Sequence, residues 1–334
     1  RQREVFARRL FAGQWFGTVL SPKEWKDIWL SHAMAHYFEA LFNAHRNGRD
    51  EFLLYQLATD HATYLGDWTS GVRHPVVTPH FASVDAFTSD NYSSVRGALV
   101  LHMLRKHLGD EKWGRAIKRY VAANAGKQVT TADLQAAVDA EAGESMAWFF
   151  DQWVYRMGHP VFAIGKRYDP VSRTVTLSVS QRQRVDSNDE YPQVALFKGK
   201  VDVEIDGRIE TVWLEPKPEQ SFTFASPTAP RLVNFDYQST WIKELTFEKS
   251  LDEWLYQLEN DRDVLGRATA MQELVAIAKK EPSTVEDRQR IYSAFRTVIS
   301  SGAYWRLRAN ALSQLRGLLA PDPPAAALDG TTRR

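Results

Sequence analysis

The sequence contains no cysteine among its 334 residues. Disulfide bonds, thiol nucleophiles and thiolate metal ligands are therefore excluded, so any metal ion would have to be bound by His, Asp or Glu. The lack of cysteine does not identify the compartment in which the protein works, and its localisation stays unknown.

Long apolar runs and a strong excess of charge are also missing. No segment approaches the ~18 apolar residues that a membrane-spanning helix needs, so we expect no membrane span in this chain. The formal net charge of +1 and the pI of about 8.1 give no reason to expect a nucleic acid or an anionic membrane as a partner. The sequence begins at Arg1 without a methionine or a signal-like segment, and we expect it to be part of a longer protein.

The hydrophobic pattern predicts a multidomain α+β protein. Hydrophobic residues make up 44% and charged residues 25%, which is typical of a globular chain, and the length favours two or three domains. A helical period runs through residues 1–158, a period of two follows in residues 159–248, and the helical period returns in residues 249–320. Residues 321–334 are expected to be disordered.

Local signals indicate where the helices of residues 1–158 begin and end. Gly109 is expected to stop the helix ALVLHMLRKHL, and Asp110 is expected to cap the helix that follows. Thr130 followed by Asp133 predicts the cap of a further helix.

Residues 159–248 are predicted to form a small β-sandwich. TVTLSVS places Val175, Leu177 and Val179 on one face, and KVDVEIDGRIETVWL reads as a hairpin that turns at Asp206 and Gly207. Four amphipathic helices follow with short connections, and their regular succession favours an α-solenoid of the HEAT type in residues 249–320.

The most informative stretch is QWFGTVLSPKEWKDIWLSHAMAHYFEALF, residues 14–42. It closely resembles the M1 family of zinc aminopeptidases, gluzincins of the aminopeptidase N type, whose motif reads HExxHQWFG, then W-x-D-x-W-L, then NEGFA-x-Y-x-E. The residues that match this motif are Gln14, Trp15, Phe16, Gly17, Trp25, Asp27, Trp29, Leu30, Ala35, Tyr37, Phe38 and Glu39. Further matches follow in the same order at residues 74–76, 96–109, 130–135 and 149–160. The resemblance implies the helical half of a thermolysin-like peptidase domain, followed by the sandwich and the helical array.

The resemblance also implies a zinc site, but its residues have changed here. In the family, two His at i and i+4 of one helix and a Glu from the next helix bind zinc, the Glu after the first His is the general base, and a Tyr supports the oxyanion. The equivalent ligand positions hold Arg9, Gly13 and His32, the base position holds Leu10, and the Tyr position holds Ser94. We therefore predict no metal site, no catalytic residue and no cofactor, although zinc is the cofactor of the family.

The changed residues oppose the ancestral chemistry. Arg9 brings a permanent positive charge, with a pKa above ~12, to a metal position, and Gly13 has no donor atom. Zinc-bound water ionises near pH ~7 and free water near ~15.7, so loss of zinc removes the nucleophile. Loss of an oxyanion donor typically costs a further factor of ~10²–10³ in rate. We expect the family reaction to be absent.

Two alternatives concern the same residues. His32, His36 and Glu39 could form a relocated metal site, because the two histidines are four residues apart. The simpler interpretation is that His32 and His36 are polar side chains that line an emptied cleft. Arg8 and Arg9 could bind a carboxylate or another anion through their guanidinium groups, or Arg9 could pair with a nearby acid of the chain. The candidate cleft residues are Arg8, Arg9, His32 and His36.

Other residues favour no separate chemistry. Ser93 and Ser94 lack the G-x-S-x-G elbow of a serine hydrolase, and Asp60 lies beside His61 without a nucleophile in view. The tryptophans are expected to be mostly core residues and not a carbohydrate or nucleobase platform; the examples are Trp15, Trp25, Trp29 and Trp153.

The leading hypothesis is an M1-like protein that has lost catalysis and acts as a binding or scaffold module for a peptide or protein partner. The alternative is an active metal-dependent aminopeptidase with a rearranged site. The family's N-terminal β-domain and its substrate-gripping segment are absent from this sequence. The missing half of the M1 fold is therefore a candidate partner, and the stretch FARRLFAGQWFG is predicted to expose an apolar interface to it.

Overall fold

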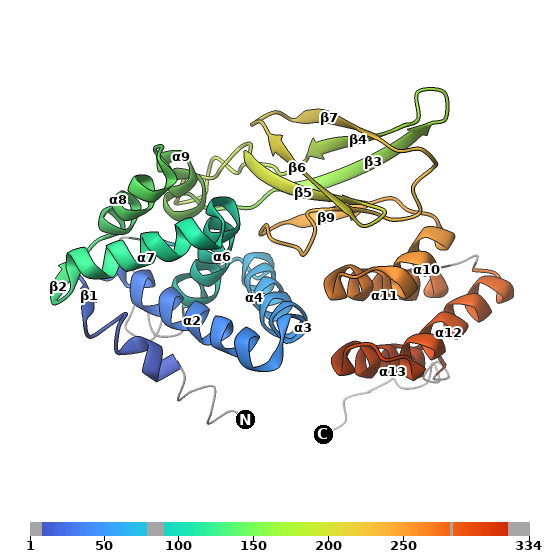
Figure 1. Ribbon diagram of the computed structural model, residues 1–334, viewed down its shortest axis with the longest axis horizontal. Coiled ribbons are helices and arrows are strands. Elements are labelled where there is room, and N and C mark those ends of the chain that lie inside the picture. The colour runs from blue at the N-terminus through green and yellow to red at the C-terminus, as the bar shows by residue number, and fades with distance from the viewer. Residues whose placement is uncertain (1–8, 79–89, 281–282, 320–334) are drawn as a thin grey trace, which may run out of the picture. The chain divides into compact units, whose positions relative to one another are not determined.

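The computed structural model of the protein describes residues 9–78, 90–280 and 283–319 (Figure 1). Contacts divide the chain into two compact units, 1–248 and 249–334. The first unit contains helices followed by β-sheets, and the described part of the second contains helices only. No helix in the described ranges is both long enough and apolar enough to cross a bilayer.

The helical part of the first unit is organised around α2 (Trp29–Asn47), which packs against η3 (Tyr92–Arg96) and α6 (Gly97–Leu108). The other helical elements are η1 (Trp25–Asp27), α3 (Arg49–Glu51), η2 (Phe52–Leu57), α4 (Ala58–Thr69), α7 (Asp110–Asn124), α8 (Thr131–Ala142), α9 (Ala147–Phe150) and η4 (Asp151–Tyr155). Three of these elements, η2, η3 and η4, are π-helical turns: η2 joins α3 to α4, η3 leads into α6, and η4 follows α9. π-helical turns are rare in proteins overall, and those that occur are often found at functional sites.

The predicted helix boundaries are mostly confirmed. Gly109, with a φ of 81°, ends α6 as predicted, and it is also the cap of α7. Asp110 is therefore the first residue of α7, and the prediction that it is the cap is wrong, because the left-handed glycine takes both roles. Thr130 caps α8 as predicted, and it forms a capping box with Asp133.

One short sheet in the helical part was not predicted. Strand β1 (Leu20–Pro22) pairs in parallel with β2 (Lys127–Val129), more than a hundred residues later in the chain. Each strand has three residues, so neither shows the alternation by which a strand is found in a sequence.

The prediction for the tryptophans is half wrong. Trp29 and Trp153 are each 1% exposed, but Trp15 and Trp25 are 48% and 70% exposed. Trp15 follows the short helical stretch of residues 9–13 and Trp25 lies on η1 at the surface, so neither reaches the core.

Residues 161–247 form two antiparallel-rich sheets. The first has the order β7-β4-β3-β9 and the second β6-β5-β8. Their strands are β3 (Val161–Asp169), β4 (Thr174–Gln181), β5 (Gly199–Ile205), β6 (Arg208–Leu214), β7 (Glu219–Ala225), β8 (Val233–Phe235) and β9 (Glu244–Phe247). Phe162 of the first sheet and Phe235 of the second pack edge to face, with ring centroids 5.2 Å apart.

The alternation predicted for this region is confirmed. Val175, Leu177 and Val179 are all buried on one face of β4. The hairpin of β5 and β6 turns at Asp206 and Gly207, whose φ angles of 47° and 85° are those of a two-residue hairpin turn.

The described part of the second unit consists of α10 (Leu251–Asn260), α11 (Val264–Lys279), α12 (Val285–Ser300) and α13 (Trp305–Leu319). Ser250 and Glu253 form a capping box on α10, and Thr284 caps α12. The helices are where the periodicity predicted them, whereas their HEAT-type arrangement and the domain boundaries stay predictions. The predicted disordered tail lies outside the described residues.

Candidate functional site

The residues predicted to be equivalent to the family's zinc and catalytic positions lie on three segments of the first unit. Residues 9–13 form a helical stretch that carries Arg9, Leu10 and Gly13 and ends in a tight turn. Helix α2 carries His32, and the π-helical turn η3 carries Ser94. Leu10 is 54% exposed and has no group that could accept a proton.

The Arg9 guanidinium lies against α2. Its Nε donates a hydrogen bond of 3.2 Å to Oε2 of Glu39, and its Nη2 donates to Nδ1 of His36. The Arg9 side chain is 44% exposed but that of Glu39 is 2% exposed, so a buried carboxylate has Arg9 as its counter-charge. Arg9 thus pairs with an acid of the chain, whereas Arg8 lies outside the described residues.

Both ring nitrogens of His36 are engaged. A guanidinium can only donate, so Nδ1 accepts from Arg9 and the ring proton belongs on Nε2. That nitrogen donates to Oδ2 of Asp60 over 2.9 Å, and the side-chain amide of Gln56 donates to the same carboxylate over 3.1 Å. A metal ion at His36 would therefore have to displace Arg9 or Asp60.

Gln56 and Asp60 are site residues that the sequence did not identify. In the sequence, Asp60 stands out only as the neighbour of His61. Gln56 lies on the π-helical turn η2 and Asp60 on α4, and their spacing of four residues predicts that they meet each other. Nothing in that spacing predicts that both meet His36, which lies on another helix.

His32 is bonded to a different segment. Its Nδ1 lies 3.1 Å from Oγ of Ser93 on η3. Burial lowers the pKa of His32, and the positive charge of Arg9 lowers it further, against the opposing effect of Asp90. His32 is therefore a neutral side chain at pH 7, bonded to η3 through Ser93.

Asp90 fixes the start of η3. It accepts hydrogen bonds of 2.9 Å from the backbone amides of Tyr92 and Ser93, and Nε2 of His74 lies 3.2 Å from its carboxylate. Burial by itself would raise the pKa of Asp90, but the bond from His74 and the two amides hold that pKa below its ordinary value. The segment that carries Ser93 and Ser94 is thus positioned by a buried, ionised carboxylate.

The side chains at the family-equivalent positions do not fit zinc. A zinc ligand must offer a lone pair from nitrogen, sulfur or oxygen. The guanidinium of Arg9 offers only donors, Gly13 has no side chain, and His32 alone supplies a ring nitrogen. In the described part of the chain no three His, Asp or Glu side chains are grouped so that they could hold a metal ion.

An apolar groove of about 1030 Å³ runs beside this network. Of its side chains, Phe11, Trp15 and Phe42 are 68%, 48% and 45% exposed. The exposure of Phe11 and Trp15 agrees with the apolar surface predicted for this stretch. The groove is lined by Phe11, Ala12, Trp15, Phe16, Phe38, Glu39, Leu41, Phe42, Ile117, Lys118, Val121 and Ala122.

Stability is expected to fall on acidification because of two buried histidines. Burial lowers the pKa of His61 and of His102 to about 3, from an ordinary 6.5. In the unfolded chain both would be protonated below pH 6.5, whereas in the folded chain they stay neutral, so the unfolding free energy falls as the pH drops from 6.5 toward 3.

Urea unfolding followed by circular dichroism across this pH range measures the loss. The variant His102→Gln keeps a polar side chain near Tyr37 and removes one titrating group, so its stability should fall less steeply. An identical pH dependence for the variant and the parent chain would contradict the assignment.

Comparison with known proteins finds similarity to M1 aminopeptidases. The model of the peptidase family M1 domain matches residues 5–153. Aminopeptidase M1-B of Oryza sativa subsp. japonica is 29% identical over 164 residues, which cover 45% of this chain and 17% of that protein. The probable aminopeptidase 2 of Sulfurisphaera tokodaii is 26% identical over 246 residues, which cover 71% of this chain and 29% of that protein.

The fold agrees with these matches. A crystal structure of Legionella pneumophila aminopeptidase A in complex with aspartic acid aligns with 95% of this chain and 35% of its own, with a TM-score of 0.73 and 14% identity. At that identity the likeness shows the fold alone. The chain spans less than a third of the length of the two curated relatives. The family model, the relatives and the fold agree, and this chain is an M1 aminopeptidase-like protein.

Proposed function

We propose that this chain is a catalytically silent M1-type module that binds a peptide or protein partner. The observation that carries the proposal is the environment of Arg9: a guanidinium at the first ligand position of the family, bonded to Glu39 and to His36. A divalent cation at this position would meet a fixed positive charge, and that charge already neutralises the buried acid beside it.

The other family-equivalent positions support the same proposal. Leu10 has no proton acceptor where the family has its general base, and Ser94 has a short hydroxyl where the family has a tyrosine. The site would have to recover a nucleophile, a base and an oxyanion donor to catalyse peptide hydrolysis.

Metal content and turnover test the proposal directly. The purified chain, dialysed after exposure to zinc, should retain no stoichiometric zinc by plasma mass spectrometry. It should not hydrolyse a panel of amino-acid amides, with an intact M1 aminopeptidase as the positive control. Stoichiometric zinc together with turnover that EDTA abolishes would instead establish the alternative, an active metal-dependent aminopeptidase using His32, His36 and Glu39.

The apolar groove is the proposed binding surface. It is formed by residues within the M1-matched region, and the relatives that match this region are several times longer than the chain. We propose that its occupant is the polypeptide that forms the preceding half of the M1 fold, from the same or another chain. Lys118 lies in the groove lining as an exposed residue and supplies a polar contact beside the aromatic side chains.

The groove can be tested with a hydrophobic dye such as 8-anilinonaphthalene-1-sulfonate. The variant Phe11→Asp/Phe42→Asp should bind less dye than the parent chain, because charge in the groove opposes apolar contact. Val171→Asp is the matched control, since Val171 is 92% exposed on the β3–β4 connection, away from the groove. Equal dye binding by all three proteins would mean that the groove is not an accessible apolar surface.

Helices α10 to α13 are proposed to form a HEAT-like array that serves as a scaffold. Three of them have 16, 16 and 15 residues, and each contacts its neighbours along the chain. Stacked helical pairs of this kind expose an extended surface on which proteins bind.

A further inference from the structure

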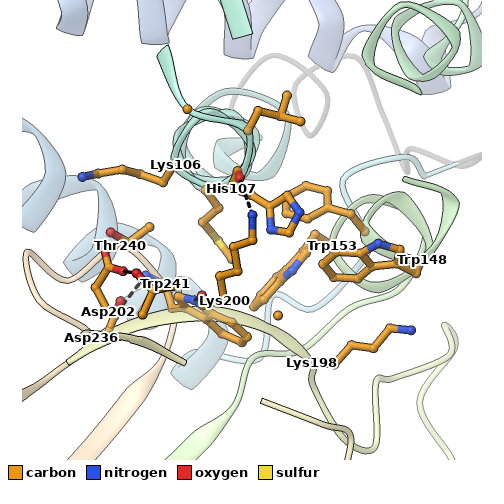
Figure 2. A pocket seen from close by; sticks show the side chains of 16 residues that line it. Lys106, His107, Trp148, Trp153, Lys198, Lys200, Asp202, Asp236, Thr240 and Trp241 are labelled. Carbon is orange, nitrogen blue, oxygen red and sulfur yellow. Dashed lines mark hydrogen bonds between the residues drawn. The ribbon is translucent and has the colours of Figure 1, made fainter. Parts of the chain in front are cut away.

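A second pocket, of about 380 Å³, lies in the first unit where the end of α6 and helix α9 meet β5 and the loop that follows β8. We call it the junction pocket; it is formed around Lys106, His107, Trp148, Lys198, Lys200 and Trp241. Figure 2 shows Lys200 reaching toward His107, with Trp148 and Lys198 on one side and Asp202, Asp236 and Thr240 on the other. His107 lies near the end of α6, which continues η3, and is about 20 Å along this helical segment from Ser94 at 1.5 Å per residue.

Three lysines bring positive charge to this pocket. Nζ of Lys200 donates to the carbonyl oxygen of His107 over 3.3 Å, and Nζ of Lys106 donates to Oε1 of Gln238 over 3.2 Å. Nζ of Lys198 lies 5.4 Å from the centre of the Trp148 ring. Within the described ranges, none of these three ammonium groups has a carboxylate oxygen within 4.0 Å.

The two carboxylates of the pocket are engaged elsewhere. Oδ2 of Asp236 lies 2.7 Å from Nζ of Lys243 and accepts a hydrogen bond of 2.9 Å from the backbone amide of Trp241. Asp202 accepts a hydrogen bond of 2.6 Å from the hydroxyl of Thr211. The hydroxyl of Thr211 does not neutralise Asp202, so the pocket holds three lysine charges against one carboxylate without a cationic partner. The excess of positive charge attracts an anion.

Aromatic side chains form the remaining wall. Trp148 is half-buried, and the ring of His107 meets it edge to face with centroids 5.4 Å apart. Burial and Lys200 lower the pKa of His107 to about 4, so this ring is uncharged at pH 7. A Cβ at Gly199 would lie 3.0 Å from the Trp241 ring and 3.6 Å from that of Trp148, so the glycine lets both rings approach the strand.

The loop beside the pocket has an unusual backbone. Asp236, Gln238 and Ser239 have φ angles of 57°, 66° and 48°, a region that side chains other than glycine rarely adopt. The ion pair of Asp236 with Lys243, whose side chains are 1% and 7% exposed, holds the loop in this conformation. Backbone strain that is maintained by a buried pair is frequent at ligand sites.

We propose that the junction pocket binds a small aromatic carboxylate. The carboxylate would lie against the ammonium groups of Lys198 and Lys200, and the ring would lie against Trp148. The volume is at the lower end of the range for small-molecule sites, which fits a ligand of one or two rings. This site uses neither Arg9 nor the apolar groove, so it goes beyond the proposed function and does not depend on it.

Indole-3-carboxylate is a suitable probe, with indole-3-carboxamide as its uncharged match and acetate as its match without a ring. Isothermal titration calorimetry on the full chain should give saturable binding of one indole-3-carboxylate, at least about tenfold tighter than either match. The variant Lys198→Met/Lys200→Met should bind the carboxylate at least about tenfold more weakly and the carboxamide unchanged. Lys112→Met, on α7 and bonded to the carbonyl of Ala142, is the control and should bind as the parent chain does.

A second variant separates the ring contact from the charge. Trp148→Leu should weaken the binding of indole-3-carboxylate and leave the binding of acetate unchanged. Circular dichroism with thermal unfolding would show that each variant is folded. The proposal is overturned if indole-3-carboxylate shows no saturable binding at millimolar concentration. It is also overturned if the carboxamide binds equally well, or if the folded lysine variant binds as the parent chain does.

Discussion

A chain with Arg9→His, Gly13→His and His32→Glu is expected to purify with about one bound zinc ion, whereas the parent chain should hold none. The two introduced imidazoles would stand four residues apart on one helical face. Position 13 has room for a side chain, since a Cβ built there meets no atom within 4 Å. Glu39 accepts a hydrogen bond from Arg9 in the parent chain. In the variant, its carboxylate would accept a hydrogen bond from the ring N–H of the imidazole at position 9 that does not bind zinc.

Metal content after dialysis against a weak chelator measures the gain. The matched control is Arg9→His/Gly13→His/His32→Ala, which has both imidazoles but lacks the carboxylate and should retain much less zinc. A folded triple variant that retains no zinc would show that residues 9–13 and α2 do not hold these positions as a zinc site requires.

Arg96→Met is expected to destabilise the first unit by about 3–5 kcal/mol. Arg96 is 0% exposed, and its guanidinium donates to the carbonyl oxygens of His74, Arg156 and Gly158 over 3.1, 3.3 and 3.2 Å. Methionine fills similar space but donates nothing, so three carbonyl groups from two separate segments would lose their charge-assisted hydrogen bonds. Urea unfolding followed by tryptophan fluorescence measures the difference in unfolding free energy.

Arg119→Met provides the comparison. Its side chain is 54% exposed and pairs with Glu141, which Arg115 also contacts, so the expected cost is below about 1 kcal/mol. A loss for Arg96→Met as small as that for Arg119→Met would mean that the buried guanidinium does not connect the start of α6 to the segment before β3.

The local features of the fold were predictable because each depends on neighbouring residues. The alternation of Val175, Leu177 and Val179 predicts strand β4, and the Asp206-Gly207 pair predicts the hairpin turn between β5 and β6. Gly109 was found as a helix end, but its second role as the cap of α7 was missed, since the same left-handed residue can serve both helices. The pairing of β1 with β2 was missed as well, because strands of three residues carry no periodic signal.

The sequence by itself determined that a guanidinium and a bare glycine occupy positions 9 and 13, the predicted zinc positions, because the chemistry of these groups does not depend on the fold. It could not determine that Arg9 meets Glu39, that His36 meets Asp60, or that three lysines surround one pocket. Those contacts join residues that are 30, 24 and more than 90 positions apart. Only the packing of α2, α4, α6 and β5 brings them together, and no spacing along one helix or strand encodes that packing.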